Sequence, residues 1–307
     1  MTVLSADFAG IAFRNPIVLA SGTAAYGREL HDIVDLNRLG GLFTKAVSLA
    51  PRPGAKAPRV SDFPGGMINA IGLANPGVDV VRDTELPWLA AHLTQTRVLV
   101  NVVGNAPEDF AEVIAQLGEA EPVSGFELNV SCPNVKAGGM EFGADAVVLR
   151  ALIERARAAT AKPLVIKLSP TLTHLVGSAQ VCADAGADAL TLTNTLPGLV
   201  IDIHTRRPRL GFGSGGVSGP PLLPIGVLAT WRVSRAVALP IIGLGGVSRA
   251  EHALQYIMAG ATLVGVGTAG MVDPRTPERI VRDLERWCSR EGVSSLASVR
   301  GSLQWPS

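Results

Sequence analysis

Residues 240–268, PIIGLGGVSRAEHALQYIMAGATLVGVGT, decide the fold of this chain. Two short apolar runs, at 241–244 and 262–266, each end in a glycine turn, and a segment with helical periodicity at 250–259 lies between them. A strand, a helix and a second strand in this order form a right-handed crossover between parallel strands. Both runs are apolar at nearly every position, which is typical of parallel strands that are covered on both faces.

The same alternation extends from this unit toward the N-terminus. We expect strands at residues 17–20, 42–44, 98–102, 126–128, 164–168, 189–193, 241–244 and 262–266. We expect helices at residues 31–39, 78–91, 107–117, 146–159, 175–185, 224–238, 250–259 and 277–290. Repeated alternation of this kind predicts an α/β fold, a TIM (β/α)8 barrel of one domain over residues 1–307, with an open doubly wound sheet as the alternative. Residues 3–8 and 11–13 predict a small N-terminal hairpin that could plug the barrel floor.

The composition suits one large α/β domain. The chain has 307 residues, of which 47% are hydrophobic, and its mean hydropathy is +0.31. The apolar residues come in short runs, and none approaches the roughly 20 residues that span a bilayer, so we expect no membrane association. Charged residues make up 17% of the chain and the net charge is +1, so we expect no nucleic acid partner.

The three cysteines, Cys132, Cys182 and Cys288, lie far apart and form no CxxC pair. We therefore predict no metal site, no disulfide framework and no iron–sulfur cluster held by this chain alone. Cys182 and Cys288 lie within helical patterns and are expected to be buried and inert. The N-terminal segment lacks a basic region, a long apolar stretch and a cleavage site, so a cytoplasmic enzyme is expected.

Polar residues stand at the ends of the predicted strands. In a (β/α)8 barrel these positions converge on the mouth where active sites lie. Lysine is costly to bury without a partner, so repeated lysines at strand ends indicate an anionic or carbonyl-rich ligand. After the last two strands, glycines would let backbone N–H groups approach a phosphate closely. These positions are Ser21, Lys45, Asn101, Asn129, Lys167, Asn194, Gly245, Gly246, Gly267 and Thr268.

Cys132 follows the fourth predicted strand and precedes a proline, which places it on a loop at the barrel mouth. A thiol serves as a general base near neutral pH when its surroundings favour the thiolate. The glycine-rich continuation, residues 134–139, could move as a lid. The segment 67–77, MINAIGLANPG, suits a loop that offers amide and backbone hydrogen bonds to a planar ligand. Asn69, Asn129 and Asn194 together could bracket a ring with carbonyl and N–H groups.

The chain resembles the class 1 dihydroorotate dehydrogenases, and most closely the class 1B catalytic subunit. The resemblance runs over nearly the whole chain. Its motifs are LASG at 19–22, TK at 44–45, PRPG at 51–54, MINAIGLANPG at 67–77, NVSCPN at 129–134, IKLSP at 166–170, NT at 194–195, GVSG at 216–219, GG at 245–246 and GT at 267–268.

This resemblance implies a noncovalent FMN and a set of residues that bind it. The flavin would be held by Ser21, Lys45, Ala46, Asn101, Asn129, Lys167, Thr193 and Gly219, and its phosphate by Gly245, Gly246, Gly267 and Thr268. Dihydroorotate would be bound by Lys45, Asn69, Ala70, Ile71, Gly72, Leu73, Asn129, Asn194 and Thr195. Cys132 would take the proton from C5 of dihydroorotate while the C6 hydride passes to the flavin, which yields orotate for pyrimidine biosynthesis.

The class 1B resemblance also implies a partner. In that class a second subunit carrying FAD and a 2Fe–2S cluster passes electrons to NAD, and it joins a homodimer of the catalytic subunit into a heterotetramer. The continuation VKAGG at 135–139 matches this pattern, whereas the homodimeric, fumarate-dependent class 1A enzymes usually have a Pro-Gly-Lys-Pro type of lid. The basic segments 52–59 and 206–209 are candidates for partner contact, with a solvated surface as the alternative for each.

Other readings of the same features remain open. A dihydropyrimidine dehydrogenase uses a related barrel and cysteine, and the VKAGG continuation disfavours it. A tRNA dihydrouridine synthase also has an FMN barrel with a loop cysteine, but it needs a basic RNA-binding surface that a net charge of +1 does not predict. A non-enzymatic phosphate-binding scaffold would leave Cys132 and the strand-end lysines unexplained.

Overall fold

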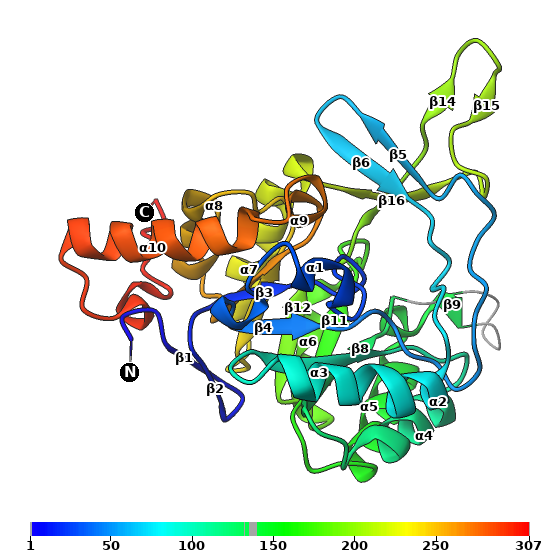
Figure 1. Ribbon diagram of the computed structural model, residues 1–307, viewed down its shortest axis with the longest axis horizontal. Helices are drawn as coiled ribbons and strands as arrows, with labels where there is room; N and C mark the ends of the chain where they lie inside the picture. The colour runs from blue at the N-terminus through cyan, green and yellow to red at the C-terminus, as the bar shows by residue number, and fades with distance from the viewer. Residues whose placement is uncertain (1, 132, 135–139, 307) are drawn as a thin grey trace.

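The computed structural model of the protein describes residues 2–131, 133–134 and 140–306 (Figure 1). Its centre is a closed barrel of parallel strands, in which the last strand pairs with the first. The strands are β3 (Ile17–Leu19), β4 (Gly41–Phe43), β7 (Arg97–Val102), β8 (Val123–Asn129), β11 (Leu164–Leu168), β12 (Ala189–Leu192), β17 (Ile241–Leu244) and β18 (Leu263–Val266). Each predicted strand is thereby confirmed, and closure excludes the open doubly wound sheet.

Most predicted helices are confirmed to within a few residues. They are α4 (Pro107–Leu117), α5 (Ala146–Ala158), α6 (Leu175–Asp184), α7 (Leu223–Ser234), α8 (Ala250–Met258) and α10 (Thr276–Glu291). The predicted helix at 78–91 is formed by α2 (Val78–Val80), a π-helical turn (Val81–Glu85) and α3 (Leu86–His92). No helix formed by the described residues is long and apolar enough to cross a membrane.

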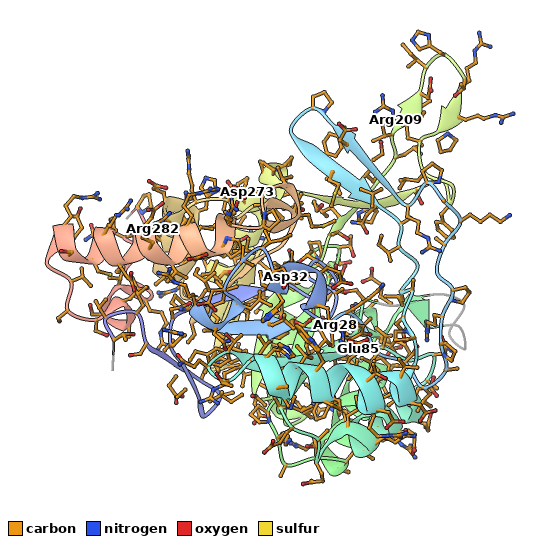
Figure 2. All side chains as sticks on the ribbon, viewed as in Figure 1. Arg28, Asp32, Glu85, Arg209, Asp273 and Arg282 are labelled. Atoms are coloured by element: carbon orange, nitrogen blue, oxygen red, sulfur yellow. The ribbon has the colours of Figure 1, made fainter. Side chains whose placement is uncertain are left out.

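The predicted helix at 31–39 is wrong. The chain forms only α1 (Arg28–His31) and a separate 3-10 turn (Leu36–Arg38) in this region. The Asp35 carboxylate accepts a hydrogen bond from the backbone N–H of Asn37 at 3.0 Å, and this local cap starts a new turn in place of a continuous helix. Arg28 of α1 forms an ion pair with Glu85 at 2.8 Å, which ties this short helix to the π-helical turn (Figure 2).

The N-terminal hairpin closes the barrel floor, as predicted. It consists of β1 (Ala6–Phe8) and β2 (Ile11–Phe13) in antiparallel register. Phe8 and Phe13 are fully or almost fully buried, and their rings meet edge to face with centroids 6.0 Å apart. Both rings pack against inward-facing residues from the barrel strands, including Phe43 and Leu99. The interior below the mouth is therefore a packed apolar core.

A four-stranded antiparallel sheet above the barrel mouth was not predicted. Its strands, in spatial order, are β13 (Leu196–Gly198), β16 (Gly215–Ser218), β6 (Gly66–Asn69) and β5 (Val60–Phe63). The prediction of a loop over 67–77 is thus wrong for its first residues, because Met67–Asn69 pair with β16, far away in the sequence. A hairpin of β14 (Ile201–Asp202) and β15 (Arg207–Pro208) extends from this sheet and projects away from the barrel (Figure 1).

Shorter elements complete the chain. Among the described residues they are the paired strands β9 (Pro133–Asn134) and β10 (Met140–Glu141), helix α9 (Thr268–Val272) after β18, and 3-10 turns at Phe142–Ala144, Pro220–Leu222 and Leu296–Val299. The turn at Pro220–Leu222 leads directly into α7, and Leu222 and Leu223 lie close to Gly245 and Gly246 at the end of β17.

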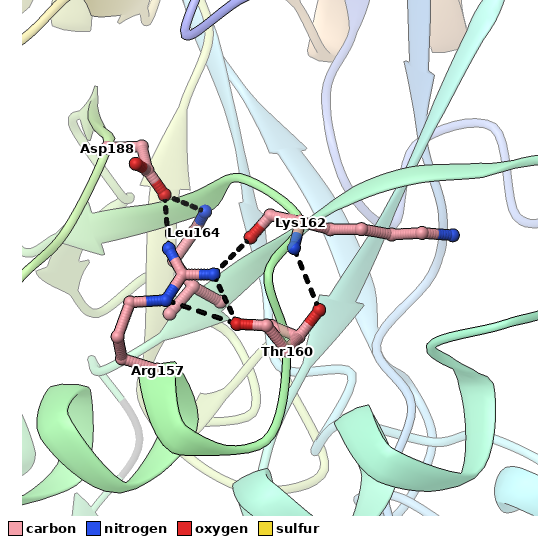
Figure 3. A network of polar contacts seen from close by, with 5 residues as sticks. All are labelled: Arg157, Thr160, Lys162, Leu164 and Asp188. Carbon is pink, nitrogen blue, oxygen red and sulfur yellow. Dashed lines mark hydrogen bonds and ion pairs between the residues drawn. The ribbon is translucent and has the colours of Figure 1, made fainter.

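Arg157 stabilises the side of the barrel opposite the mouth (Figure 3). Its guanidinium binds the Asp188 carboxylate at 2.7 Å and donates to the carbonyl oxygens of Thr160 and Lys162. The same Asp188 oxygen accepts from the backbone N–H of Leu164 at 2.8 Å. This network joins the end of α5 to the start of β11 and to the residue before β12.

We expect Arg157→Met to lower the free energy of unfolding by about 1–3 kcal/mol, because carbonyl oxygens and a carboxylate lose their donors. Urea denaturation followed by circular dichroism measures the change. Arg155→Met is the matched control on the same helix, since Arg155 forms an exposed ion pair with Glu108, and such pairs contribute little. Equal destabilisation by the two variants would contradict a special role for Arg157.

Candidate active site

A cavity of about 900 Å³ opens over the carboxyl ends of the barrel strands and beneath the antiparallel sheet. Apart from Cys132, every residue that the sequence predicts for the site lines this cavity. They are Ser21, Lys45, Ala46, Asn69, Ala70, Ile71, Gly72, Leu73, Asn101, Asn129, Lys167, Thr193, Asn194, Thr195, Gly219, Gly245, Gly246, Gly267 and Thr268. Cys132 and the predicted lid residues 135–139 lie outside the described residues.

The cavity floor is built from inward-facing side chains at the strand ends. Successive residues of a strand point to opposite faces, so Lys167 faces inward while Ile166 and Leu168 join the outer core. Lys167 is 5% exposed, and its ammonium donates to the Ser21 hydroxyl at 3.1 Å. One hydrogen bond to a neutral hydroxyl does not offset the cost of burying a cation. Lys167 therefore favours an anionic or carbonyl-bearing ligand in the cavity.

Two asparagines line the floor next to Lys167. The side-chain amide of Asn194 donates to the side-chain oxygen of Asn129 at 3.4 Å. The Asn194 oxygen accepts from the backbone N–H of Thr195 at 2.8 Å, which fixes its orientation. These amides present both donors and acceptors on one side of the cavity, as a planar ligand with ring carbonyl and N–H groups requires.

Glycines form a close-fitting turn after β17. Gly246 has φ +70°, and a Cβ built there would lie 2.7 Å from the backbone nitrogen of Leu223. The Tyr256 hydroxyl donates to the carbonyl oxygen of Gly245 at 2.9 Å and holds this turn from beneath. Thr268, after β18, donates to the Ser218 hydroxyl at 2.9 Å. The positive φ and the closeness of Leu223 require glycine at Gly246, and Gly245, Gly246, Gly267 and Thr268 all line the cavity. Glycine turns of this kind bind phosphate through backbone N–H groups, so the site fits a phosphorylated cofactor.

The segment 70–73 forms a wall of the cavity after β6. The backbone of Ala70 donates to the Arg59 carbonyl at 2.8 Å, and the Ile71 carbonyl accepts from Ala55 at 3.0 Å. Arg59 also donates through its side chain to the Ala55 carbonyl at 2.6 Å. From the sequence, the segment 52–59 is a candidate for partner contact. In the structure, Arg59 of this segment stabilises the cavity wall.

Asn75 belongs to the scaffold of the same segment. Its side chain is 6% exposed and accepts from the backbone N–H of Gly77 at 2.9 Å. It also donates to the Ser48 hydroxyl and the Leu73 carbonyl, each at 2.8 Å. Leu73 adopts a positive φ of 56° beside Gly72, and the Asn75 amide holds that turn in place.

Sequence reasoning missed acidic residues around the cavity. Glu141, on β10, lines it and accepts from the Ser169 hydroxyl at 3.3 Å. Burial raises the pKa of the Glu141 carboxyl, and hydrogen bonds from Ser169 and Thr171 partly oppose this. Strand alternation after Lys167 could have identified Ser169. Glu127, two residues before Asn129, faces the same interior and could have been identified in the same way.

The other two cysteines fit their predicted inert role. Cys182 and Cys288 are buried in α6 and α10, respectively. Burial raises the pKa of the Cys182 thiol to about 12 and also raises that of Cys288. A thiol with a raised pKa is protonated near neutral pH, so neither supplies a base.

Comparison with known proteins identifies the family. The sequence model of the dihydroorotate dehydrogenase family matches residues 3–287. The chain is 46% identical to the catalytic subunit of dihydroorotate dehydrogenase B (NAD(+)) from Pelobacter propionicus, over 98% of both chains. The corresponding subunits from Geobacter sp. strain M21 and Geobacter sulfurreducens are each 44% identical over the same shares. This chain therefore belongs to the dihydroorotate dehydrogenase family.

Proposed function

We propose that this chain is the catalytic subunit of an NAD-linked dihydroorotate dehydrogenase and oxidises dihydroorotate to orotate in pyrimidine biosynthesis. Membership of the family and 46% identity to a catalytic subunit of the B type support this proposal. The observation that carries it in the structure is the cavity at the barrel mouth. It brings buried Lys167, the amides of Asn129 and Asn194, and the glycine turn at Gly245 and Gly246 to one place.

The family uses a flavin, and the cavity residues support FMN as the flavin of this chain. The cramped glycine turn and Thr268 would hold its phosphate. Ser21, Lys167 and Asn101 would contact the ring system on the floor, together with Lys45, Ala46, Asn129, Thr193 and Gly219. Bound FMN would supply the hydride acceptor. The fixed charge of Lys167 would stabilise negative charge at the ring, because it is held in place before the reaction begins.

The remaining wall of the cavity would bind dihydroorotate. Lys45 would attract the substrate carboxylate, and Asn69, Asn129, Asn194 and Thr195 would bind the polar groups of its ring. The segment 70–73 would complete the wall. Cys132 would act as the base that removes the C5 proton. Its chain neighbour Ser131 lines this cavity, which supports a role of the segment at the substrate.

The proposed function is tested with the purified chain under anaerobic conditions. We expect a yellow protein whose flavin absorbance bleaches on addition of dihydroorotate, with orotate as the product. Dihydrouracil and dihydrothymine should not bleach it, which separates this activity from that of a dihydropyrimidine dehydrogenase. Turnover should require NAD together with a partner subunit. Efficient turnover of the isolated chain with fumarate would instead assign it to the class 1A type.

We propose that the partner carries FAD and a 2Fe–2S cluster and joins a homodimer of this chain into a heterotetramer. The relatives are named as catalytic subunits, which supports the existence of a partner subunit.

The projecting hairpin is a candidate contact surface for the homodimer. It exposes large apolar side chains, with Ile201 53% and Ile203 77% exposed. Exposed apolar clusters of this kind are typical of protein–protein contacts, and self-association of identical chains is the commonest form of assembly.

We expect Ile203→Asp to weaken the homodimer, because it places a charge within an apolar contact. Light scattering coupled to size exclusion should show the mass of a monomer, or a dimer that dissociates at higher concentration than the wild type. Val147→Asp is the matched control, since Val147 is 78% exposed on α5. A dimer that dissociates at the same concentration as the wild type would show that the hairpin is not the contact.

A further inference from the structure

Glu127 is a buried acidic side chain without a place in the mechanism proposed above. It lies on β8 and is 2% exposed. Its neighbours Phe126 and Leu128 belong to the outer core, so Glu127 faces the barrel interior. Asn129, two residues further along, lines the cavity. Glu127 therefore lies one step below the cavity floor.

Both oxygens of the Glu127 carboxylate are engaged by neutral donors. Oε1 accepts from the side-chain amide of Asn101 on β7 at 2.6 Å. Oε2 accepts from the hydroxyl of Thr191 on β12 at 2.7 Å. Lys167 lies on β11, between β8 and β12, in register with Asn129 on one side and Thr191 on the other. The carboxylate thus ties the strands on either side of the lysine-bearing strand.

This arrangement is costly for stability. Among the described side chains, no basic group lies within ion-pair distance of Glu127. A buried carboxylate without such a partner loses more hydration than neutral hydrogen bonds restore, and an uncharged group of the same shape would serve the packing better. The charge therefore requires an explanation other than stability.

The carboxylate determines how Asn101 is oriented. An ionised carboxylate only accepts hydrogen bonds, so it selects the NH2 end of the Asn101 amide. No described residue donates to the remaining amide oxygen of Asn101, and Asn101 lines the cavity. That oxygen is therefore left for a ligand. A glutamine at position 127 would accept or donate equally well, and the Asn101 amide would be free to flip.

We propose that Glu127 is a positioning residue for the flavin: it holds the Asn101 oxygen toward the cavity as an acceptor for a flavin ring N–H, and it places a negative charge below the ring. This inference rests on the proposed function. The carboxylate lowers the stability of the protein and favours binding of the cofactor. Removing its charge should therefore weaken cofactor binding without lowering stability.

The test uses the full chain with the isosteric substitution Glu127→Gln. We expect FMN to bind about tenfold more weakly or worse, because a fixed charge-assisted hydrogen bond network is lost. We expect the flavin midpoint potential to rise, because a nearby negative charge is removed, and the melting temperature of the apoprotein to stay equal or rise. FMN affinity is measured by flavin fluorescence, the potential by dye equilibration and the melting temperature by calorimetry.

Two further variants separate positioning from general damage. The double variant Asn101→Ala with Glu127→Gln should bind FMN no more weakly than Asn101→Ala alone, because Glu127 acts on binding through Asn101. Thr191→Val removes the other hydrogen bond of the carboxylate and should leave FMN affinity within about threefold.

The outcomes distinguish this inference from the proposed function. If wild-type protein binds FMN and is reduced by dihydroorotate while Glu127→Gln keeps both its affinity and its potential, the role of Glu127 is wrong and the function stands. Losses that multiply in the double variant, or a Glu127→Gln apoprotein that melts at lower temperature, would assign Glu127 to the scaffold. Wild-type protein without flavin binding would overturn both proposals.

Discussion

Cys132→Ser is expected to lower the rate of flavin reduction by dihydroorotate about 10²–10⁴-fold at neutral pH, the range that a positioned general base contributes. A serine hydroxyl of nearly the same size accepts the C5 proton far less readily than a thiolate. Affinity for orotate should change little, since orotate has already lost the C5 proton that the base removes. Anaerobic stopped-flow spectroscopy measures the rate, and a flavin difference titration with orotate measures the affinity.

Cys182→Ser is the matched control for this prediction. Cys182 is fully buried in α6 and its thiol is held protonated by burial, so its replacement should alter thermal stability and leave the reduction rate within about twofold. The rate of the Cys132→Ser variant should also rise with pH further into the alkaline range than that of the wild type. Undiminished reduction in Cys132→Ser at neutral pH would remove Cys132 from the reaction.

The barrel and its mouth could be predicted because both depend on local patterns. Each strand is a short apolar run that is covered on both faces, as 164–168 illustrates, and such runs are readable one at a time. The position of the polar residue at or near each strand end, such as Lys167, then follows from one rule. The carboxyl ends of parallel barrel strands all lie on the same side of the barrel. The predicted ligand positions therefore converge on one cavity without any knowledge of long-range contacts.

The sheet above the mouth could not be predicted in this way. Met67 pairs with Ser218 across about 150 residues of sequence, and antiparallel pairing of distant short strands leaves little local signal. The prediction of a helix at 31–39 was wrong for a local reason. The side chain of Asp35 caps a new turn, and this cap outweighs the weak helical periodicity of the segment. Glu127 was readable from alternation with Asn129, but its partners Asn101 and Thr191 come from other strands.

Lys167→Met is expected to lower both the flavin midpoint potential and the rate of reduction by dihydroorotate, the rate by about 10²–10³-fold. Methionine keeps the length of the side chain but removes a buried cation whose ammonium is 3.1 Å from the Ser21 hydroxyl. A preorganised charge in a water-poor cavity stabilises negative charge at the flavin more strongly than solvent does. Dye equilibration gives the potential, and anaerobic stopped-flow spectroscopy gives the rate.

Lys162→Met provides the contrast, because this lysine lies just before the other end of the same strand, β11, where its ammonium donates to the Val123 carbonyl at 2.7 Å. That variant should lose some stability and keep the wild-type potential, since Lys162 is on the side of the barrel away from the cavity. Equal shifts of the potential in both variants would mean that net charge alone tunes the flavin. A shift confined to Lys167→Met requires a cation fixed at the cavity floor, which is the feature that the strand-end lysines predict.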